Sequence, residues 1–399
     1  MSVSQIILPV ACAAVLSSAF SYCFARYSGR LRLVAKPRPD RWHETPTPNT
    51  GGLGILIACS AAYLLFARAG YGTIAACAGL VALLGFVDDR VQLPPIAKLA
   101  GQAVATAVVI ISGITFHWTP WIWANVMITA LWIIGITNAF NLIDNMDGLC
   151  AGVAAIAAAS GAALAFLEQD GQRMLLLMII GASCLGFLIF NYKPARIFMG
   201  DCGSMFLGFS LASLAVGSPR EADSMLDGFY APSAFLYPIF DTVLVSVLRR
   251  AAGRPISVGG RDHSSHRLVI AGLTEQEAVW ALWAIAGICA AYGPLAYHHP
   301  DWFLIATASL LVALGGFGYV LAVLPAFGFQ SPSQSSKPIV AFLQRGTYTT
   351  SPQVSALPSE ASADRAAVYA QGPVDRFNTQ TLLRAAHCGD PDCARPEGS

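Results

Sequence analysis

The chain has 399 residues, of which 55% are hydrophobic and only 12% are charged, with a formal net charge of +1. A soluble domain carries about 25% charged residues, so this composition excludes an ordinary soluble enzyme and indicates a polytopic membrane protein. The net charge says little by itself, and we expect no nucleic-acid partner. The ten cysteines are scattered, mostly in apolar runs, and are expected to be small buried hydrophobes rather than a disulfide framework.

Eleven apolar segments are candidates to cross a bilayer, which takes about 20 apolar residues. The first has no basic residue before it and several after it, so we expect a retained span rather than a secretory signal. The expected fold is an all-α polytopic membrane protein with about 11 transmembrane helices. The segments lie near residues 6–25, 52–68, 71–87, 95–113, 121–140, 149–166, 174–191, 203–217, 231–249, 277–297 and 302–325.

The basic residues favour one orientation of these spans. With the N-terminus outside, only Arg68, Arg173 and Arg220 of the 24 lysines and arginines fall in outer segments. This positive-inside bias predicts a periplasmic N-terminus and a cytoplasmic C-terminus. Residues 330–399 are rich in Ser, Pro, Gln and Ala, so we expect a disordered cytoplasmic tail after a membrane domain at 1–329.

Five polar islands interrupt the apolar sequence. Placing a carboxylate near a bilayer core costs free energy, so carboxylates that occur there usually have a function. The topology places four islands at the inner face and the fifth, Asp241, inside a span roughly 12 Å from its inner end at 1.5 Å per residue. This arrangement predicts an acidic, metal-dependent site at one membrane surface. The islands are Asp88-Asp89, Asn138 to Asp147, Asp201, Asp241, and Asp262 to His266.

The adjacent carboxylates Asp88 and Asp89 diverge by about 100° on a helix. They are therefore not expected to bind one ion in the same way. We expect one of them to face the substrate while the other holds a basic side chain such as Arg90 or Lys98. The alternative is a solvated helix end.

Four oxygen-bearing side chains, Asn138, Asn141, Asp144 and Asp147, recur every three residues. Neighbouring pairs can converge on one ligand although the four fan over half of a helix. Such donors suit Mg²⁺ or Mn²⁺. The alternative is a capping cluster, with Asp147 or Asn145 as the cap.

Asp201 is flanked by glycines and precedes a new span. Glycines let a bulky anion approach the backbone, and the helix that follows would present its positive N-terminus to a phosphate. The alternative is that Asp201 is only an N-cap. Asp241 is expected to pair with a basic residue or to support the site.

The most basic inner loop contains His263 and His266 between Arg261 and Arg267. The two histidines are three residues apart and can face one side of a turn. Together with the arginines they predict a grip for phosphate groups. The alternative is a loop that contacts lipid headgroups.

In this order, the islands resemble the motifs of the polyprenyl-phosphate N-acetylhexosamine-1-phosphate transferases, the family of MraY-, WecA- and TagO-like enzymes. The resemblance covers roughly residues 38–269. In the last inner loop Ser265 takes the place of a histidine, which argues against the UDP-MurNAc-pentapeptide enzyme and favours the WecA-like branch. In addition, Asn49 stands where the family often has a basic residue. The matching segments are Pro46 to Gly52, Asp88-Asp89, Asn138 to Gly148, Phe198 to Asp201, Pro238 to Thr242, and His263 to Leu268.

The resemblance implies transfer of a sugar-1-phosphate from a UDP-sugar to undecaprenyl phosphate, with Mg²⁺ or Mn²⁺ and release of UMP. It implies that Asp88 lies near the lipid phosphate as the candidate base. A phosphate monoester is already largely ionised near neutral pH, its second pKa being about 6, so positioning or metal binding is the alternative role for Asp88. The expected catalytic residues are Asp88, Asp89, Asp144 and Asp147; the substrate-binding residues are Asn138, Asp241, Arg261, His263, His266 and Arg267; and the metal ligands are Asp201 and Asn141.

The expected enzyme lies in a bacterial inner membrane, with its site on the cytoplasmic face, and starts a lipid-linked surface glycan such as O-antigen. UDP-GlcNAc is the expected donor, and UDP-FucNAc or UDP-QuiNAc is the alternative. Family members are often dimeric, so a homodimer is a further expectation. The rival from another class is a secondary transporter, which would need carboxylates near mid-membrane that face a cavity.

Overall fold

The computed structural model describes residues 3–28, 34–35, 47–67, 70–217, 230–255, 260 and 262–323. All of them belong to the first of two compact units, Met1–Gln344. The second unit, Arg345–Ser399, and the tail predicted at 330–399 lie outside the described residues.

The described part of the chain is almost entirely helical. Its helices are α1 (Val3–Tyr27), α2 (Gly51–Phe66), α3 (Gly72–Val91), α4 (Pro95–Ile111), α5 (Ile122–Ile143), α6 (Leu149–Leu167), α7 (Gly171–Asn191), α8 (Gly200–Val216), η1 (Ala231–Phe235), α10 (Leu236–Ala251), α11 (Ser264–Ile270), α12 (Glu275–His298), η2 (Pro300–Trp302) and α13 (Phe303–Val323). Two short strands, β1 (Val34–Ala35) and β2 (Thr47–Pro48), pair antiparallel.

Each of the eleven predicted apolar segments coincides with a helix, the ninth with η1 and α10 together. Seven described helices are long and apolar enough to cross a membrane, whereas α2, α4 and α8 are shorter apolar helices. The prediction of an all-α polytopic membrane protein is therefore confirmed at this level. The helix α11 was not predicted.

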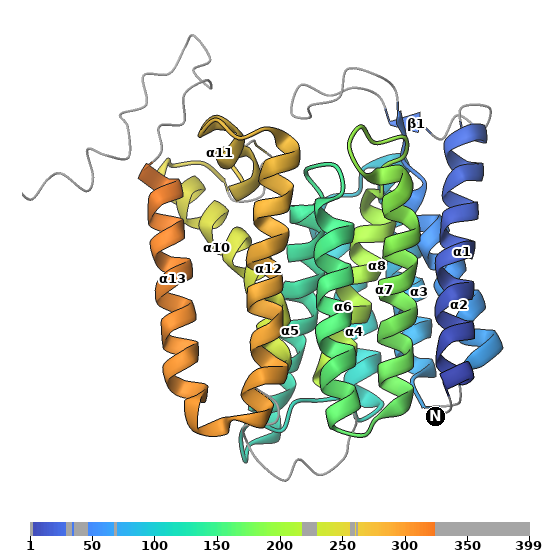
Figure 1. The fold of residues 1–399 in the computed structure, drawn as a ribbon, viewed down its shortest axis with the longest axis horizontal. Helices are drawn as coiled ribbons and strands as arrows, with labels where there is room; N and C mark the ends of the chain where they lie inside the picture. Colours follow the sequence, from blue (N-terminus) through green and yellow to red (C-terminus); the bar gives the residue numbers. More distant parts are fainter. Residues whose placement is uncertain are drawn as a thin grey trace, which may run out of the picture. The chain divides into compact units, whose positions relative to one another are not determined.

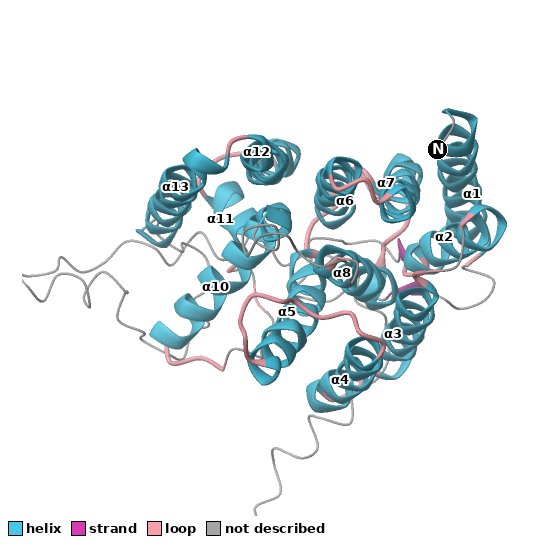
Figure 2. Cartoon of the chain, turned by 90° about the horizontal axis from the view of Figure 1, so that it is seen from below, coloured by secondary structure: helices cyan, strands magenta, loops and turns pink. Residues whose placement is uncertain are grey.

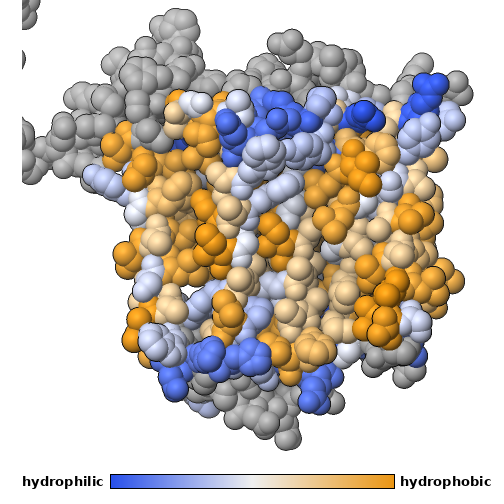
Figure 3. Space-filling model, viewed as in Figure 1, coloured by the Kyte–Doolittle hydropathy of each residue, from blue (hydrophilic) through white to orange (hydrophobic). Residues whose placement is uncertain are grey.

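The long helices stand side by side, with β1 and α11 at one end and the N-terminus of α1 at the other (Figure 1). Large apolar side chains face outward, among them Leu64, Ile111 and Val312, which are 79%, 84% and 75% exposed. An apolar band between two polar ends covers the face drawn in Figure 3. Such a surface matches hydrocarbon rather than water.

The helix α8 lies among its neighbours near the middle of the bundle (Figure 2). Nearly all of its residues are buried, and many of them are small. A Cβ on Gly208 would lie 2.8 Å from the Cα of Thr137 on α5. Small residues let helices approach closely where packing rather than water drives their association. This packing fixes the first turn of α8, which carries Asp201, against α2, α3 and α5.

Candidate active site

The first turn of α2 packs against the loop that precedes α8. The backbone N–H groups of Gly51 and Gly52 donate to the carbonyls of Phe198 and Met199, each at 2.9 Å. A Cβ on Gly52 would overlap the backbone of Gly203. The glycines are therefore required by the close approach of two backbones, and they shape the loop that carries Asp201. Pro46, the start of the predicted motif, lies outside the described residues.

The carboxylate of Asp89 caps α8. It accepts hydrogen bonds from the backbone N–H groups of Asp201 at 3.0 Å and Cys202 at 3.1 Å, and Asn49 donates to it at 2.7 Å. A carboxylate at a helix N-terminus is favourable by about 0.3–1 kcal/mol. The two amides are engaged by the protein itself, contrary to the expectation that this end of α8 faces a phosphate. The same contacts show what Asn49 does at its unusual position.

The other carboxylate of the pair, Asp88, holds a lysine. The Nζ of Lys98 lies 2.9 Å from Asp88 and 3.1 Å from Asp201. The backbone N–H of Leu93 also donates to Asp88, at 2.6 Å. The prediction that one of the two aspartates holds a basic side chain such as Lys98 is confirmed. This lysine brings Asp88 of α3 and Asp201 of α8 together.

The negative charge around Asp201 bears on whether a divalent cation fits this site. Asp201 lies in the first turn of α8, before its apolar part, and burial together with the neighbouring carboxylates Asp88 and Asp89 raises its pKa to about 6 despite the charge of Lys98. A bound cation would offset this excess of negative charge. Among the described residues, no three His, Cys, Asp or Glu side chains form a group that could hold a metal. Mg²⁺, however, commonly uses only one or two carboxylates together with water and substrate phosphates, so these donors fit Mg²⁺.

The last turns of α5 place two asparagines beside α4 and α8. The Nδ2 of Asn141 donates to the Oγ of Ser204, one turn after Asp201, at 3.0 Å. The Nδ2 of Asn138 donates to the Oε1 of Gln102 at 2.7 Å. Asn141 therefore lies near the predicted metal ligand Asp201, whereas the amide of Asn138 ties α5 to α4.

The two aspartates of the same island lie in the turn between α5 and α6. Asp144 is the C-cap residue of α5. Asp147 accepts a hydrogen bond from the backbone N–H of Ala195 at 3.0 Å, so it holds the loop between α7 and α8. Gly148 follows as the N-cap of α6 with a φ of 77°, a left-handed conformation that favours glycine.

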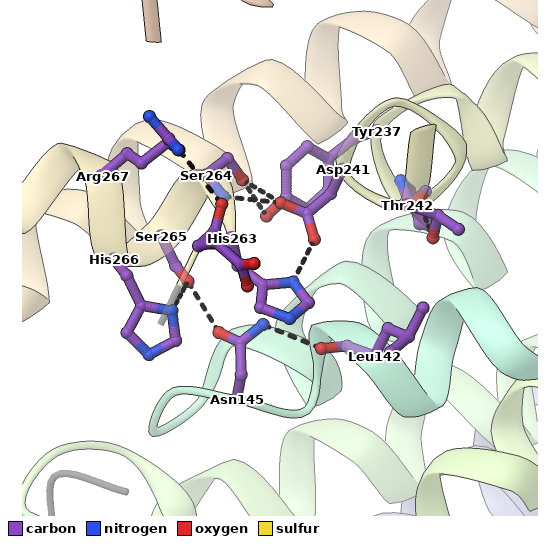
Figure 4. A network of polar contacts seen from close by, with 12 residues as sticks. Leu142, Asn145, Tyr237, Asp241, Thr242, His263, Ser264, Ser265, His266 and Arg267 are labelled. Carbon is purple, nitrogen blue, oxygen red and sulfur yellow. Dashed lines mark hydrogen bonds and ion pairs between the residues drawn. The ribbon is translucent and has the colours of Figure 1, made fainter. Parts of the chain in front are cut away.

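Asp241 supports the histidine part of the site (Figure 4). This carboxylate is 1% exposed. It accepts from the Nδ1 of His263 at 2.8 Å, and from the backbone N–H and Oγ of Ser264 at 2.7 and 2.6 Å. The expectation that Asp241 pairs with a basic residue or supports the site is confirmed. Because an ionised carboxylate only accepts hydrogen bonds, His263 carries a proton on Nδ1.

The second histidine, His266, lies close to the first. The centroids of the His263 and His266 rings are 5.9 Å apart, and both residues are buried. Between them, the Oγ of Ser265 donates to the Oδ1 of Asn145 at 2.7 Å (Figure 4). The turn that carries Asp144 therefore meets α11, the helix that follows His263 and carries His266.

The basic residues around α11 are bound to the protein. Arg249 donates to both oxygens of Asp262, at 2.8 and 2.7 Å. Burial opposes ionisation of Asp262, yet the hydrogen bonds and charge of Arg249 lower its pKa. Arg267 donates to the carbonyl of Leu321 on α13 at 2.8 Å. A contact between Arg267 and a phosphate would therefore have to use another of its N–H groups, and this contact stays a prediction. Arg261 lies outside the described residues.

Sequence reasoning missed Arg249, Asn145 and Ser265 as parts of this arrangement. Arg249 is the first basic residue at the inner end of its span, and its charge was the available signal for a partner of Asp262. No local signal links Asn145 to Ser265, because they lie 120 residues apart in the sequence.

Residues 71–218 match the sequence model of Glycosyl transferase family 4. The chain is 32% identical to the probable undecaprenyl-phosphate N-acetylglucosaminyl 1-phosphate transferase of Bacillus subtilis (strain 168), over 66% of this chain and 77% of that protein. It is 30% identical to the decaprenyl-phosphate N-acetylglucosaminephosphotransferase of Mycolicibacterium smegmatis, over 65% and 74%. It is 28% identical to the phospho-N-acetylmuramoyl-pentapeptide-transferase of Lactiplantibacillus plantarum, over 69% and 92%. These matches bear out the resemblance of the polar islands: the chain belongs to glycosyl transferase family 4 and is a membrane phosphotransferase of that family.

Proposed function

We propose that this enzyme transfers GlcNAc-1-phosphate from UDP-GlcNAc to undecaprenyl phosphate and releases UMP. The observation that carries the proposal is the meeting of Asp88 and Asp201 at Lys98, 2.9 and 3.1 Å from its Nζ. Asn141 of α5 bonds to Ser204, one helix turn after Asp201 on α8. Pyrophosphate chemistry needs such a group of charged donors to position the substrate and balance its charge. The relatives named above as N-acetylglucosaminyl transferases support GlcNAc. UDP-FucNAc and UDP-QuiNAc are the alternative donors.

In the proposed reaction, an oxygen of the lipid phosphate attacks the β-phosphorus of the UDP-sugar. A new P–O bond forms, the bond from that phosphorus to the bridging oxygen breaks, and UMP leaves with this oxygen. The attacking phosphate has a second pKa of about 6, so most of it needs no base at neutral pH. We therefore propose that Asp88 positions Lys98, whose charge faces the reacting phosphates.

Mg²⁺ would be held by Asp201 and Asn141, and when bound it would neutralise charge on the pyrophosphate. His263 and His266 would contact the donor's phosphates. Two contacts support this role: Asp241 holds the His263 ring through its Nδ1 at 2.8 Å, and the Oγ of Ser265 lies 3.4 Å from the Nδ1 of His266.

We also propose eleven crossings, with the N-terminus in the periplasm and the site on the cytoplasmic face of the bacterial inner membrane. The bias of the basic residues supports this orientation. The position of α11 at the end opposite the N-terminus of α1 agrees with it (Figure 1). The proposed reaction is the first step in the synthesis of a lipid-linked surface glycan such as O-antigen. That the enzyme forms a homodimer stays a prediction. The transporter alternative loses its support because the family is one of transferases.

The test is UMP release by purified protein in detergent, with undecaprenyl phosphate, Mg²⁺ and a panel of UDP-HexNAc donors. Asp201→Ala is expected to abolish release. Asp301→Ala, which removes an exposed aspartate in η2, is the matched control and should retain it. Release with UDP-GlcNAc that is lost only in Asp201→Ala would support the proposal. Folded protein that releases no UMP from any donor would refute it.

A further inference from the structure

The helix α11, which follows His263 and carries His266, is too short to hold its own position. It has seven residues, Ser264–Ile270, and isolated helices shorter than about 12–15 residues are marginal in water. Its neighbours must therefore set where the two histidines lie. Asp241 ties its first residue to α10, and Arg267 ties it to the end of α13.

A third contact joins α11 to the turn between α5 and α6. The Nδ2 of Asn145 donates to the carbonyl of Leu142 at 2.8 Å, and its Oδ1 accepts from the Oγ of Ser265 at 2.7 Å (Figure 4). An amide oxygen only accepts, so the serine hydroxyl is the donor. Ser265 is 0% exposed and Asn145 is half-buried, so loss of this bond leaves a largely buried polar atom without this partner.

The residues at the two ends of this bond belong to different parts of the site. Asn145 follows Asp144 in the turn between α5 and α6, which also contains Asp147 and is called the carboxylate turn below. Ser265 lies between the two histidines in the sequence. The same Ser265 oxygen lies 3.4 Å from the Nδ1 of His266, and with its proton given to Asn145 it can only accept from that nitrogen. The hydroxyl therefore joins α11 to the turn and at the same time lies within reach of the His266 ring.

We propose that Asn145 and Ser265 are positioning residues that set the spacing between the carboxylate turn and the two histidines, and so determine how tightly the enzyme holds the pyrophosphate of its nucleotide-sugar donor. Neither residue needs to touch the substrate. The inference rests on the proposed function in so far as a uridine diphosphate sugar is the ligand that contacts both parts.

The test compares Ser265→Ala, Asn145→Ala and the double variant in the full chain. The measurements are KM and kcat with UDP-GlcNAc, the Kd of UDP by calorimetry, and the melting temperature. The matched control is Ser160→Ala, which removes another buried hydroxyl; that hydroxyl donates to the carbonyl of Ala290 at 2.6 Å and joins α6 to α12.

Each single variant at the pair is expected to raise KM and the Kd of UDP about tenfold, the scale of one lost buried hydrogen bond whose partner stays unpaired. The double variant is expected to have a KM and a Kd of UDP no higher than those of the more impaired single variant, because both substitutions remove the same bond. Ser160→Ala should lower the melting temperature and leave KM and the Kd of UDP unchanged.

Ser265→Ala with the KM and UDP affinity of Ser160→Ala would overturn the proposal, as would losses that add in the double variant. If the wild type released no UMP from UDP-GlcNAc but bound UDP, a tenfold weaker Kd in Ser265→Ala would support the positioning role while the proposed donor failed. Wild-type protein that neither bound UDP nor released UMP would overturn both.

Discussion

Gly52→Ala is expected to damage the site without touching any of its polar side chains. A Cβ at this position would lie 2.7 Å from the carbonyl oxygen of Met199 and closer still to the backbone of Gly203. These are backbone atoms, so no side chain can rotate away. Overpacking of this kind costs about 1–3 kcal/mol.

The same substitution would displace the acidic part of the site. Reaching ordinary van der Waals separation requires α2 and the first turn of α8 to move apart by roughly 1 Å, and Asp201 lies two residues before Gly203 in that turn. A misplacement of about 1 Å can lower turnover about 100-fold. We therefore expect Gly52→Ala to lower kcat/KM for UMP release by about that factor, with a lower melting temperature.

Gly54→Ala is the matched control, because it makes the same change in the same helix. Its Cβ would have its nearest neighbour at 3.4 Å, the Cβ of Phe20, which is an ordinary contact. Melting temperature in detergent and UMP release per folded protein are the measurements. If Gly52→Ala melted and turned over like Gly54→Ala, the close approach of α2 and α8 would not be what positions Asp201.

Three further predictions concern charged groups and the metal. Asp89→Ala leaves two backbone amides of α8 without their acceptor and is expected to cost about 1–3 kcal/mol, whereas Asp89→Asn keeps an acceptor oxygen and should lose less; thermal unfolding of both variants checks the order. Arg249→Met leaves the largely buried Asp262 carboxylate without its bidentate partner and is expected to destabilise the protein by about 3–5 kcal/mol, with the double variant Arg249→Met/Asp262→Asn recovering part of the loss. Removal of divalent ions by EDTA is expected to abolish UMP release, and added Mg²⁺ or Mn²⁺ should restore it while Ca²⁺, which prefers more ligands at longer distances, should not.

The order and position of the helices could be predicted from sequence because apolar length is a local property. The eleven segments coincide with helices because a helix satisfies its own backbone N–H and C=O groups, which a bilayer requires. Among the α-helices of the described residues, α11 was not predicted; it is seven residues long and its N-cap residue makes no side-chain cap hydrogen bond. Its residues bond to Asp241, Asn145 and Leu321, which lie on other elements.

The residues of the site could be predicted more completely than their roles. Charged residues stand out in an apolar chain, so Asp88, Asp201, Asp241 and His263 could all be singled out from the sequence. Which groups they contact depends on how helices far apart in the sequence are packed. Asp89 is 112 residues from the backbone amide that it accepts from, and no local pattern encodes that contact.

The Asp88-Asp89 pair shows why two neighbouring carboxylates are needed at one helix end. Their side chains diverge by about 100°, so α3 can meet α8 in two ways at once. Asp89 accepts from the backbone at the start of α8, and Asp88 shares Lys98 with the side chain of Asp201. A Cβ on Gly85, one turn earlier, would overlap the carbonyl of Asp201, so the two helices can come this close only because that residue is glycine. The carboxylate that fixes the backbone of α8 thus determines where the other carboxylates lie, and Asp89 shapes the proposed chemistry without having to touch the substrate.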